Sequence, residues 1–213
     1  MIRYNQELLA YISQLSHSTS FISEKKLPQK ERIIVQGENI SNLYIIKSGI
    51  VKCFITENNG KDYILEFLGE GEIIGELEIF NNSQSLTNVE TLTDIEVFKI
   101  PNQYFIELLQ SNWNLNYLIL KELATRVAQT ASRASYQQNY PLEYSILKLI
   151  YLFSVQPLKL NKQDLADYLG ITVRSLNRTL LNLQQKGIIE AENLNLIIEQ
   201  KDIAKVLNLF ERG

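Results

Sequence analysis

The sequence changes its pattern at Pro101, and this change limits what the chain can fold into. From about residue 27 to residue 100, short runs rich in β-branched and aromatic residues alternate with glycine-containing turns. After Pro101 the apolar residues follow helical spacing as far as about Gln138. Strands repeat every two residues and helices every 3.6, so the two patterns belong to different elements. The chain is therefore expected to contain a β unit followed by a long helix.

Several runs before Pro101 are expected to be strands. The clearest turn between them is Asn58-Asn59-Gly60, because Asn-Gly tolerates the positive φ angles of a tight hairpin. Strands at this spacing predict a small sandwich or barrel, and residues 4–16 predict a short amphipathic helix before it. The expected strands are residues 33–35, 43–46, 51–55, 63–67 and 95–100.

The long helical segment is expected to pack against a second helix. Residues at a and d heptad positions run over about three heptads from Trp113. A helix packed only on its own barrel is the alternative, and the N-terminal half is expected to pack in that way. The narrow stripe of small residues over 124–131 favours a partner helix from a second copy. The expected dimer residues are Leu120, Leu123, Val127, Thr130 and Ala134.

Residues 161–187 predict a helix-turn-helix. Asn161 suits the N-cap of the first helix, Gly170 permits a sharp turn, and Thr172 suits the cap of the second helix. The outward face of the second helix offers arginine and asparagine side chains, which pair with guanine and adenine edges. The residues expected to contact DNA are Lys162, Gln163, Val173, Arg174, Ser175, Asn177 and Arg178.

The end of the chain predicts the rest of a winged helix-turn-helix. Gly187 suits the end of the second helix, and two apolar runs flank Asn193-Leu194-Asn195 as a hairpin wing. Residues 203–210 predict a closing helix. Asn139-Tyr140-Pro141 marks the boundary before this unit, because proline ends one helix and fits the first turn of the next.

The charge distribution is compatible with DNA as a partner. The formal net charge is −3, but from Pro141 onward there are nine Lys or Arg and eight Asp or Glu residues. Residues 172–187 contain Arg174, Arg178 and Lys186 and no acid. DNA binding requires a local basic face rather than a basic chain.

The composition excludes several classes of protein. No run of 18 apolar residues is present and the N-terminus lacks the pattern of a signal peptide, so we expect no membrane span and a cytoplasmic protein. Cys53 and His17 are the only residues of their types, so no metal, cofactor or catalytic site is expected. Cys53 is expected to be a small buried hydrophobe, because a redox switch requires an exposed thiol with a lowered pKa.

Over nearly its whole length the chain resembles the cAMP receptor protein/FNR (Crp/Fnr) family of bacterial regulators. Residues 75–80, Gly-Glu-Leu-Glu-Ile-Phe, are similar to the family's phosphate-binding cassette, and residues 163–170 with the following helix resemble its DNA-reading segment. The resemblance implies an α+β fold with an N-terminal jelly-roll barrel of cyclic-nucleotide-binding type, a long dimerisation helix and a C-terminal winged helix-turn-helix. The expected domains are 1–111, 112–139 and 140–213, and the implied partners are double-stranded DNA, a second copy and RNA polymerase.

The chain departs from the family at positions that matter for its ligand. Members that bind cAMP carry an Arg-Ser or Arg-Thr pair after the cassette, and Leu86-Thr87 stands there in this chain. The Thr-Ser pair of the long helix aligns with Thr130-Ala131, and the Arg-Glu…Arg set of the recognition helix aligns with Val173, Arg174 and Arg178. We therefore expect an effector other than cAMP, or none. The pocket candidates are Gly75, Glu76, Leu77, Leu86, Thr87 and Thr130.

Other interpretations remain open at this point. A cyclic-nucleotide-binding regulatory or interaction module without DNA binding is the alternative function, and the helix-turn-helix argues against it. An enzyme is the least favoured, because no glycine-rich phosphate loop with lysine is present. A basic side chain such as Lys52 or Lys61 is an alternative partner for a phosphate in place of the missing arginine.

Overall fold

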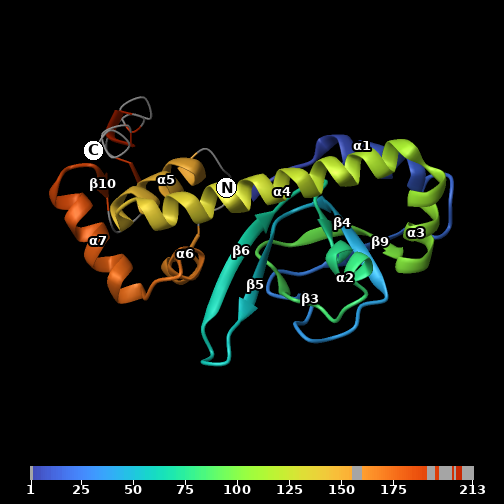
Figure 1. Ribbon diagram of the computed structural model, residues 1–213, viewed down its shortest axis with the longest axis horizontal. Helices are drawn as coiled ribbons and strands as arrows, with labels where there is room; N and C mark the ends of the chain where they lie inside the picture. Colours follow the sequence, from blue (N-terminus) through green and yellow to red (C-terminus); the bar gives the residue numbers. More distant parts are fainter. Residues whose placement is uncertain (1, 155–159, 191–194, 197–202, 204, 208–213) are drawn as a thin grey trace. The chain divides into compact units, whose positions relative to one another are not determined.

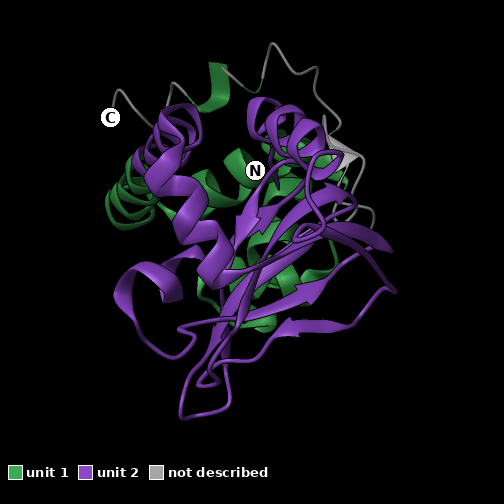
Figure 2. Cartoon of the chain, turned by 90° about the vertical axis from the view of Figure 1, so that its right-hand side faces the viewer, with its two compact units in different colours: residues 1, 127–213 green, residues 2–126 purple. Residues whose placement is uncertain are grey.

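The computed structural model of the chain describes residues 2–154, 160–190, 195–196, 203 and 205–207. Two compact units divide the chain at residue 126, and Figure 2 colours them separately. Residues 2–126 form the first unit, and the described residues from 127 onward form the second. The long helix α4 (Trp113–Asn139), labelled in Figure 1, contains the boundary and so contributes residues to both units.

Two facing sheets form the first unit. The five-stranded sheet has the order β1-β6-β5-β8-β3, and the four-stranded sheet has the order β2-β9-β4-β7. All neighbours are antiparallel except β1 and β6. The expected strands correspond to β3, β4, β5, β6 and β9. The strands are β1 (Ile2–Arg3), β2 (Ser23–Leu27), β3 (Arg32–Ile34), β4 (Asn42–Ser48), β5 (Val51–Thr56), β6 (Asp62–Leu68), β7 (Ile73–Ile74), β8 (Asn88–Thr91) and β9 (Ile95–Pro101).

Four strands lack the pattern that identified the others. β1 and β7 have two residues each, which is too short for an alternating pattern. β2 reads Ser-Glu-Lys-Lys-Leu and lies at a sheet edge, where charged residues discourage pairing with other chains. β8 carries polar residues in the interior of the five-stranded sheet, and the pairing with β3 and β5 holds it there.

The core of this unit has two parts on opposite faces of β4 and β9. Ile46 and Val97 lie in the core between the sheets, among other aliphatic residues. Ile45 and Phe98 point to the other face, where they pack under helices. Because neighbouring residues of a strand point to opposite faces, both faces of this strand pair are buried. Figure 1 shows α1 (Gln6–Ser16) and the first half of α4 running along this side.

The chain after Pro101 forms two helices where one continuous helical pattern was expected. α3 covers Asn102–Ser111, and α4 begins at Trp113. Asn112 between them has an extended backbone, with φ −132° and ψ 98°. Its Oδ1 accepts a hydrogen bond from the Leu115 amide at 3.1 Å, so it caps the new helix. Asn112, which competes with the helical backbone for hydrogen bonds, therefore interrupts the helical pattern, and α4 corresponds to the long helix expected over residues 112–139.

The second unit is helical with a small hairpin. Its further helices are α5 (Leu142–Ser154), α6 (Lys162–Leu169) and α7 (Val173–Gln185). The end of α4 belongs to this unit and packs on it through aromatic rings. The Arg133 guanidinium lies 3.7 Å from the centre of the Tyr168 ring, and Tyr140 stacks on Tyr144 at 4.4 Å.

The hairpin wing is present after α7. β10 (Ile189–Glu190) pairs with β11 (Asn195–Leu196) in antiparallel register. Asn195 was expected in the turn but already belongs to β11; residues 193–194 and 197–199 lie outside the described residues. Of the expected closing helix, residues 203 and 205–207 are helical and Phe210 lies outside the described residues.

Candidate functional site

Local hydrogen bonds build the helix-turn-helix as the sequence predicts. The Asn161 side chain accepts the Asp164 amide at 2.8 Å and caps α6. Gly170 ends α6 with φ +68°, a left-handed conformation that favours glycine. Thr172 caps α7 by accepting the Ser175 amide at 3.1 Å. Each of these signals is confirmed, because each depends on residues within one turn of chain.

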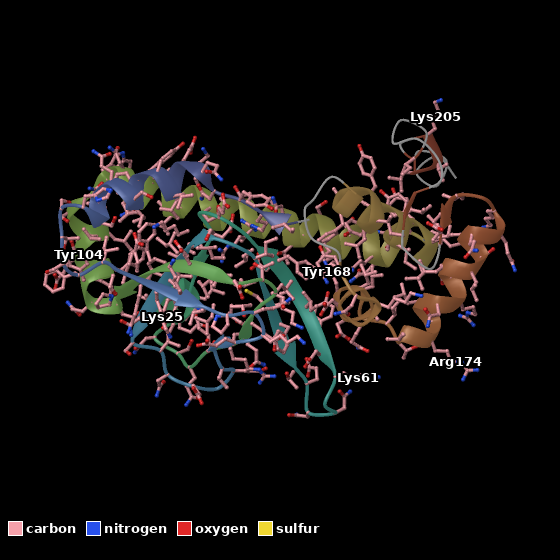
Figure 3. The ribbon with its side chains drawn as sticks, turned by 180° about the vertical axis from the view of Figure 1, so that it is seen from behind. Lys25, Lys61, Tyr104, Tyr168, Arg174 and Lys205 are labelled. Carbon is pink, nitrogen blue, oxygen red and sulfur yellow. The ribbon has the colours of Figure 1, made fainter. Side chains whose placement is uncertain are left out.

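The two faces of α7 have opposite character. Its inward leucines, Leu176, Leu180 and Leu183, are buried. Arg174 and Arg178 lie one turn apart on the exposed side, and Figure 3 shows the Arg174 side chain extending away from the helix. Among the residues that the structure describes, neither arginine has an ion-pair partner. The exposed face of α7 therefore carries two guanidiniums that are available to a binding partner.

An open groove runs along this face of α7. The side chain of Glu143, at the start of α5, accepts from Asn182 at 2.5 Å and pairs with Lys186 at 3.2 Å. These bonds fix the end of α7 against α5. The groove is lined by Pro141, Leu142, Glu143, Thr172, Arg174, Ser175, Asn177, Arg178, Thr179, Leu181, Asn182 and Gln185.

The structure gathers only part of the expected DNA-binding set in this groove. Arg174, Ser175, Asn177 and Arg178 line it together. Val173, Lys162 and Gln163 are not among its lining residues; the Gln163 amide instead donates to Asp167 at 2.7 Å. Arg174, Ser175, Asn177 and Arg178 thus share one surface of α7, and Lys162 and Gln163 of α6 do not line this groove.

A second region surrounds the cassette in the first unit. Gly75 has φ +95°, and a Cβ atom there would lie 2.7 Å from Ile40 Cδ1. Glu76 follows as the first residue of α2 (Glu76–Asn81), and its side chain is buried. A buried carboxylate requires compensation, which comes from α4.

Arg126 of α4 supplies that compensation. Its guanidinium donates to the Glu76 carboxylate and to the Ile73 carbonyl, the latter at 2.7 Å. The same guanidinium pairs with Glu72 and with Glu122, at 3.2 Å in each case. One arginine therefore connects the long helix to the cassette and to the residue before β7.

Arg3 of β1 completes this group. Its guanidinium donates to Glu122, and it pairs with Glu66 and Glu72 at 3.4 Å. Asn5 also donates to Glu122, at 2.9 Å. We call the set the Arg126 cluster: Arg3, Glu66, Glu72, Glu76, Glu122 and Arg126.

The Arg126 cluster holds four carboxyl groups and only two guanidiniums. Burial raises the pKa of Glu72 from its ordinary value of 4.5 to about 7, although Arg126 and Arg3 lower it. Glu122 beside it raises the pKa further, because two nearby carboxylates repel. Burial also raises the pKa of Glu76, against the attraction of Arg126. The cluster is therefore an acidic environment that already contains its own cations.

The other expected pocket residues have different surroundings. Leu86 is 56% exposed, and Leu77 is also exposed. Thr87 is half-buried, and Thr130 belongs to the other compact unit and is exposed. The Glu78 carboxylate accepts the Leu86 amide at 3.2 Å and the Ser85 hydroxyl at 3.0 Å. Of the expected set, only Glu76 lies in the Arg126 cluster.

The cation beside Glu76 of the cassette is Arg126, and not Lys52 or Lys61, the alternatives that the sequence left open. Lys52 pairs with Glu90 at 3.2 Å, and Lys61 is exposed beside the β5–β6 turn (Figure 3). Sequence reasoning missed Arg126 as a member of this group. The available signal was its spacing of four residues from Glu122, which suits a helical ion pair.

The expected dimer residues lie on α4, and most are exposed. Trp113, Leu120 and Val127 recur every seven residues with 75%, 56% and 70% exposure. Thr130 and Ala134 are also exposed. Leu123 differs, because it is half-buried and packs against the core under α1 and α3.

The sequence also led to expectations about Cys53, metal sites and membrane spans. Cys53 is buried, and burial raises the pKa of its thiol well above the ordinary value of 9.0, so the requirements for a redox switch are not met. Among the described residues, no group of His, Cys, Asp and Glu is arranged to hold a metal ion. Within the same residues, no helix has the length and apolar character needed to cross a membrane.

Two family models match the chain, one over the β unit and one over the helix-turn-helix. Residues 24–112 match the cyclic nucleotide-binding domain, and residues 148–209 match the Crp-like helix-turn-helix domain. The chain belongs to the Crp/Fnr family of transcriptional regulators. This Crp/Fnr protein is therefore a DNA-binding transcription regulator.

Known proteins resemble this Crp/Fnr protein in sequence and in fold. It is 26% identical over 184 residues to the cAMP-activated global transcriptional regulator CRP of Salmonella typhimurium, covering 81% of this chain and 88% of that protein. The c-di-GMP responsive regulator CLP of Xanthomonas campestris has a TM-score of 0.76 at 21% identity, covering 84% and 94% of the two chains. A Crp/Fnr family regulator of Thermus thermophilus has a TM-score of 0.75 at 16% identity, covering 87% and 98%.

Proposed function

We propose that this Crp/Fnr regulator binds a palindromic DNA site as a homodimer and reads bases with Arg174 and Arg178. The observation that carries the proposal is the pair of exposed guanidiniums one turn apart on α7. A guanidinium forms two parallel hydrogen bonds with guanine O6 and N7, and Asn177 has the donor and acceptor that adenine requires. A two-fold dimer places its half-sites about 34 Å apart, one turn of DNA.

The exposed stripe of α4 supports the homodimer. Trp113, Leu120 and Val127 place large apolar groups on one face every seven residues, and such a repeat matches a second copy of the same helix. An apolar groove of about 570 Å³ lies beside Leu120, between α2, α3 and α4. Leu123 lines the same groove, but it is half-buried and also packs against the core of its own unit, so it contributes less exposed surface than Leu120.

We further propose that cAMP is not the effector. The cyclic phosphate carries a full negative charge, and a buried charge requires a partner. Leu86 stands where the family resemblance implies the arginine that pairs with it, and Arg126 is already occupied by Glu72, Glu76 and Glu122. Placing an anion beside this group adds repulsion from carboxylates instead of a salt bridge. A neutral or less anionic ligand, or no ligand, fits these charges better.

DNA binding also has consequences for where the protein acts and for its protein partner. A regulator that binds DNA acts where the DNA lies, so we place it in the bacterial cytoplasm, with RNA polymerase as its protein partner. The proposal assigns no catalytic reaction to it. The alternative, a cyclic-nucleotide-binding module without DNA binding, is disfavoured by the match of residues 148–209 to a Crp-like helix-turn-helix domain.

Selection from a random duplex pool tests the proposal. The purified full-length protein is expected to enrich a palindromic sequence, and footprinting should show protection of two half-sites one turn apart. Enrichment of no sequence would contradict the proposed DNA reading. Enrichment of a single half-site, bound by one chain, would contradict the homodimer alone.

A further inference from the structure

One leucine of α7 is not part of the core that the others form. Leu176, Leu180 and Leu183 have at most 1% exposure, whereas Leu181 is 57% exposed. Single exposed leucines are common on protein surfaces, so the exposure alone indicates nothing. The position of Leu181 on the helix is what makes it informative.

Leu181 lies on the same face as the two proposed base-reading arginines. It follows Arg178 by three residues and Arg174 by seven, spacings that place side chains above one another on a helix. It also lines the same groove as both arginines. The face that the proposed function turns toward DNA therefore includes an exposed apolar side chain.

The residues that follow Leu181 on α7 bind the start of α5. Asn182 donates to Glu143 at 2.5 Å, and Lys186 pairs with Glu143 at 3.2 Å. These contacts hold the C-terminal half of α7 against α5 and restrain the Leu181 backbone. A side chain on a restrained backbone can read shape, because its position does not adjust freely.

We infer that Leu181 contacts the 5-methyl group of a thymine in each half-site and so contributes to sequence specificity. Thymine is the only standard base that presents a methyl group in the major groove, and apolar side chains recognise it by contact. Three residues of helix advance about 4.5 Å, slightly more than the roughly 3.4 Å step between base pairs. The thymine is therefore expected within about two base pairs of the base that Arg178 reads. This inference rests on the proposed function of α7.

Replacement of thymine by deoxyuridine tests the contact, because it removes only the methyl group. The test uses the palindrome enriched by the full-length protein and replaces symmetry-related thymines one pair at a time. Loss of one buried methyl corresponds to about 0.8 kcal/mol, or about fourfold in affinity per half-site and about fifteenfold for the pair. One thymine pair should show this loss with the unmodified protein.

Variants of α7 assign the effect to Leu181. Leu181→Ala should bind the thymine and deoxyuridine sites with equal affinity at that pair, and Leu181→Met should retain discrimination. Gln185→Ala, at an exposed position of the same groove, is the matched control and should discriminate like the unmodified protein.

The outcomes separate this inference from the proposed function. If no sequence is enriched, the proposed reading by α7 fails and the inference fails with it. If a palindrome is enriched but no thymine pair discriminates, or Leu181→Ala discriminates as the unmodified protein does, only the inference is overturned.

Discussion

Arg126 of α4 donates a hydrogen bond to the carboxylate of Glu76, the first residue of the cassette helix α2. Both side chains are nearly buried, with 11% and 2% exposure. The pair connects the long helix to the segment that resembles a phosphate-binding cassette. The positive charge beside the cassette therefore comes from α4, and not from position 86, where the family resemblance implies an arginine.

Removal of the Arg126 charge is expected to destabilise the first unit strongly. Arg126→Met would leave Glu76 buried without its cation and would leave Glu72 and Glu122 with Arg3 alone; breaking a buried pair in this way costs about 3–5 kcal/mol. Urea unfolding measures the loss. Lys121→Met, which removes an exposed pair with Glu7 from α4, is the control and should have a much smaller effect. Equal losses of unfolding free energy in the two variants would show that the buried cluster stabilises the protein no more than an exposed ion pair does.

Stability is expected to fall as pH rises from about 4.5 to about 7. The pKa of Glu72 is about 7 in the folded chain and 4.5 without burial, so the folded state holds more protons in this window. Folding therefore becomes less favourable as the proton is lost, by up to about 3 kcal/mol, and the loss is complete above pH 7. Arg126, Arg3 and Glu122 are the charged groups that face Glu72. Unfolding free energies at pH 5, 6, 7 and 8 should show this slope, and Glu72→Gln should reduce it; an unchanged slope in the variant would assign the effect elsewhere.

Lysines in the exposed stripe of α4 are expected to give monomers. Leu120→Lys with Val127→Lys would place like charges opposite each other in a two-fold seam. Sedimentation at micromolar concentration should show a dimer for the unmodified protein and a monomer for the variant. Gln129→Lys, exposed about half a turn from Val127, should remain dimeric. A monomeric unmodified protein would end the argument for this interface.

The protein is expected to bind cAMP weakly or not at all. Losing one partner of a buried charged pair costs about 2–5 kcal/mol, which is roughly thirty-fold to several-thousand-fold in affinity. Titration calorimetry should detect no binding at tens of micromolar. Leu86→Arg should increase the affinity, because it returns a donor to the position that the family resemblance assigns to the phosphate. A dissociation constant at or below about 10 μM for the unmodified protein, with tighter DNA binding on saturation, would refute the prediction.

Arg178→Ala is expected to cost about 1–3 kcal/mol of DNA affinity and to relax specificity at one position in each half-site. Lys186→Ala is the matched control at the end of the same helix, since Lys186 pairs with Glu143 and not with another residue of α7. The control should lower affinity for all sequences to a similar, small extent. Affinity measurements on the enriched palindrome and its single-base variants distinguish the two, and a uniform loss with Arg178→Ala would make this residue a phosphate contact only.

The elements that could be predicted from the sequence are those whose causes are local. Asn161, Gly170 and Thr172 act within one helical turn, so the helix-turn-helix was readable from spacing alone. The hairpin at Asn58-Asn59-Gly60 was readable for the same reason, and Gly60 has the expected positive φ of +75°. The family resemblance supplied the jelly-roll architecture, which periodicity limited only to a sandwich or barrel.

The tertiary structure decided which charges far apart in the chain meet and which leucines are covered. Arg3 and Glu122 are 119 positions apart, and no periodic pattern connects them. Leu120 and Leu123 fit the same heptad pattern, yet Leu120 is exposed and Leu123 packs on the barrel core, because the barrel covers one side of α4. Local hydrogen bonds depend on neighbours in the chain, whereas burial and ion pairing depend on what the fold brings close. The sequence therefore determined the elements whose signals are local, and the packing of β1, α2 and α4 on the barrel determined the Arg126 cluster.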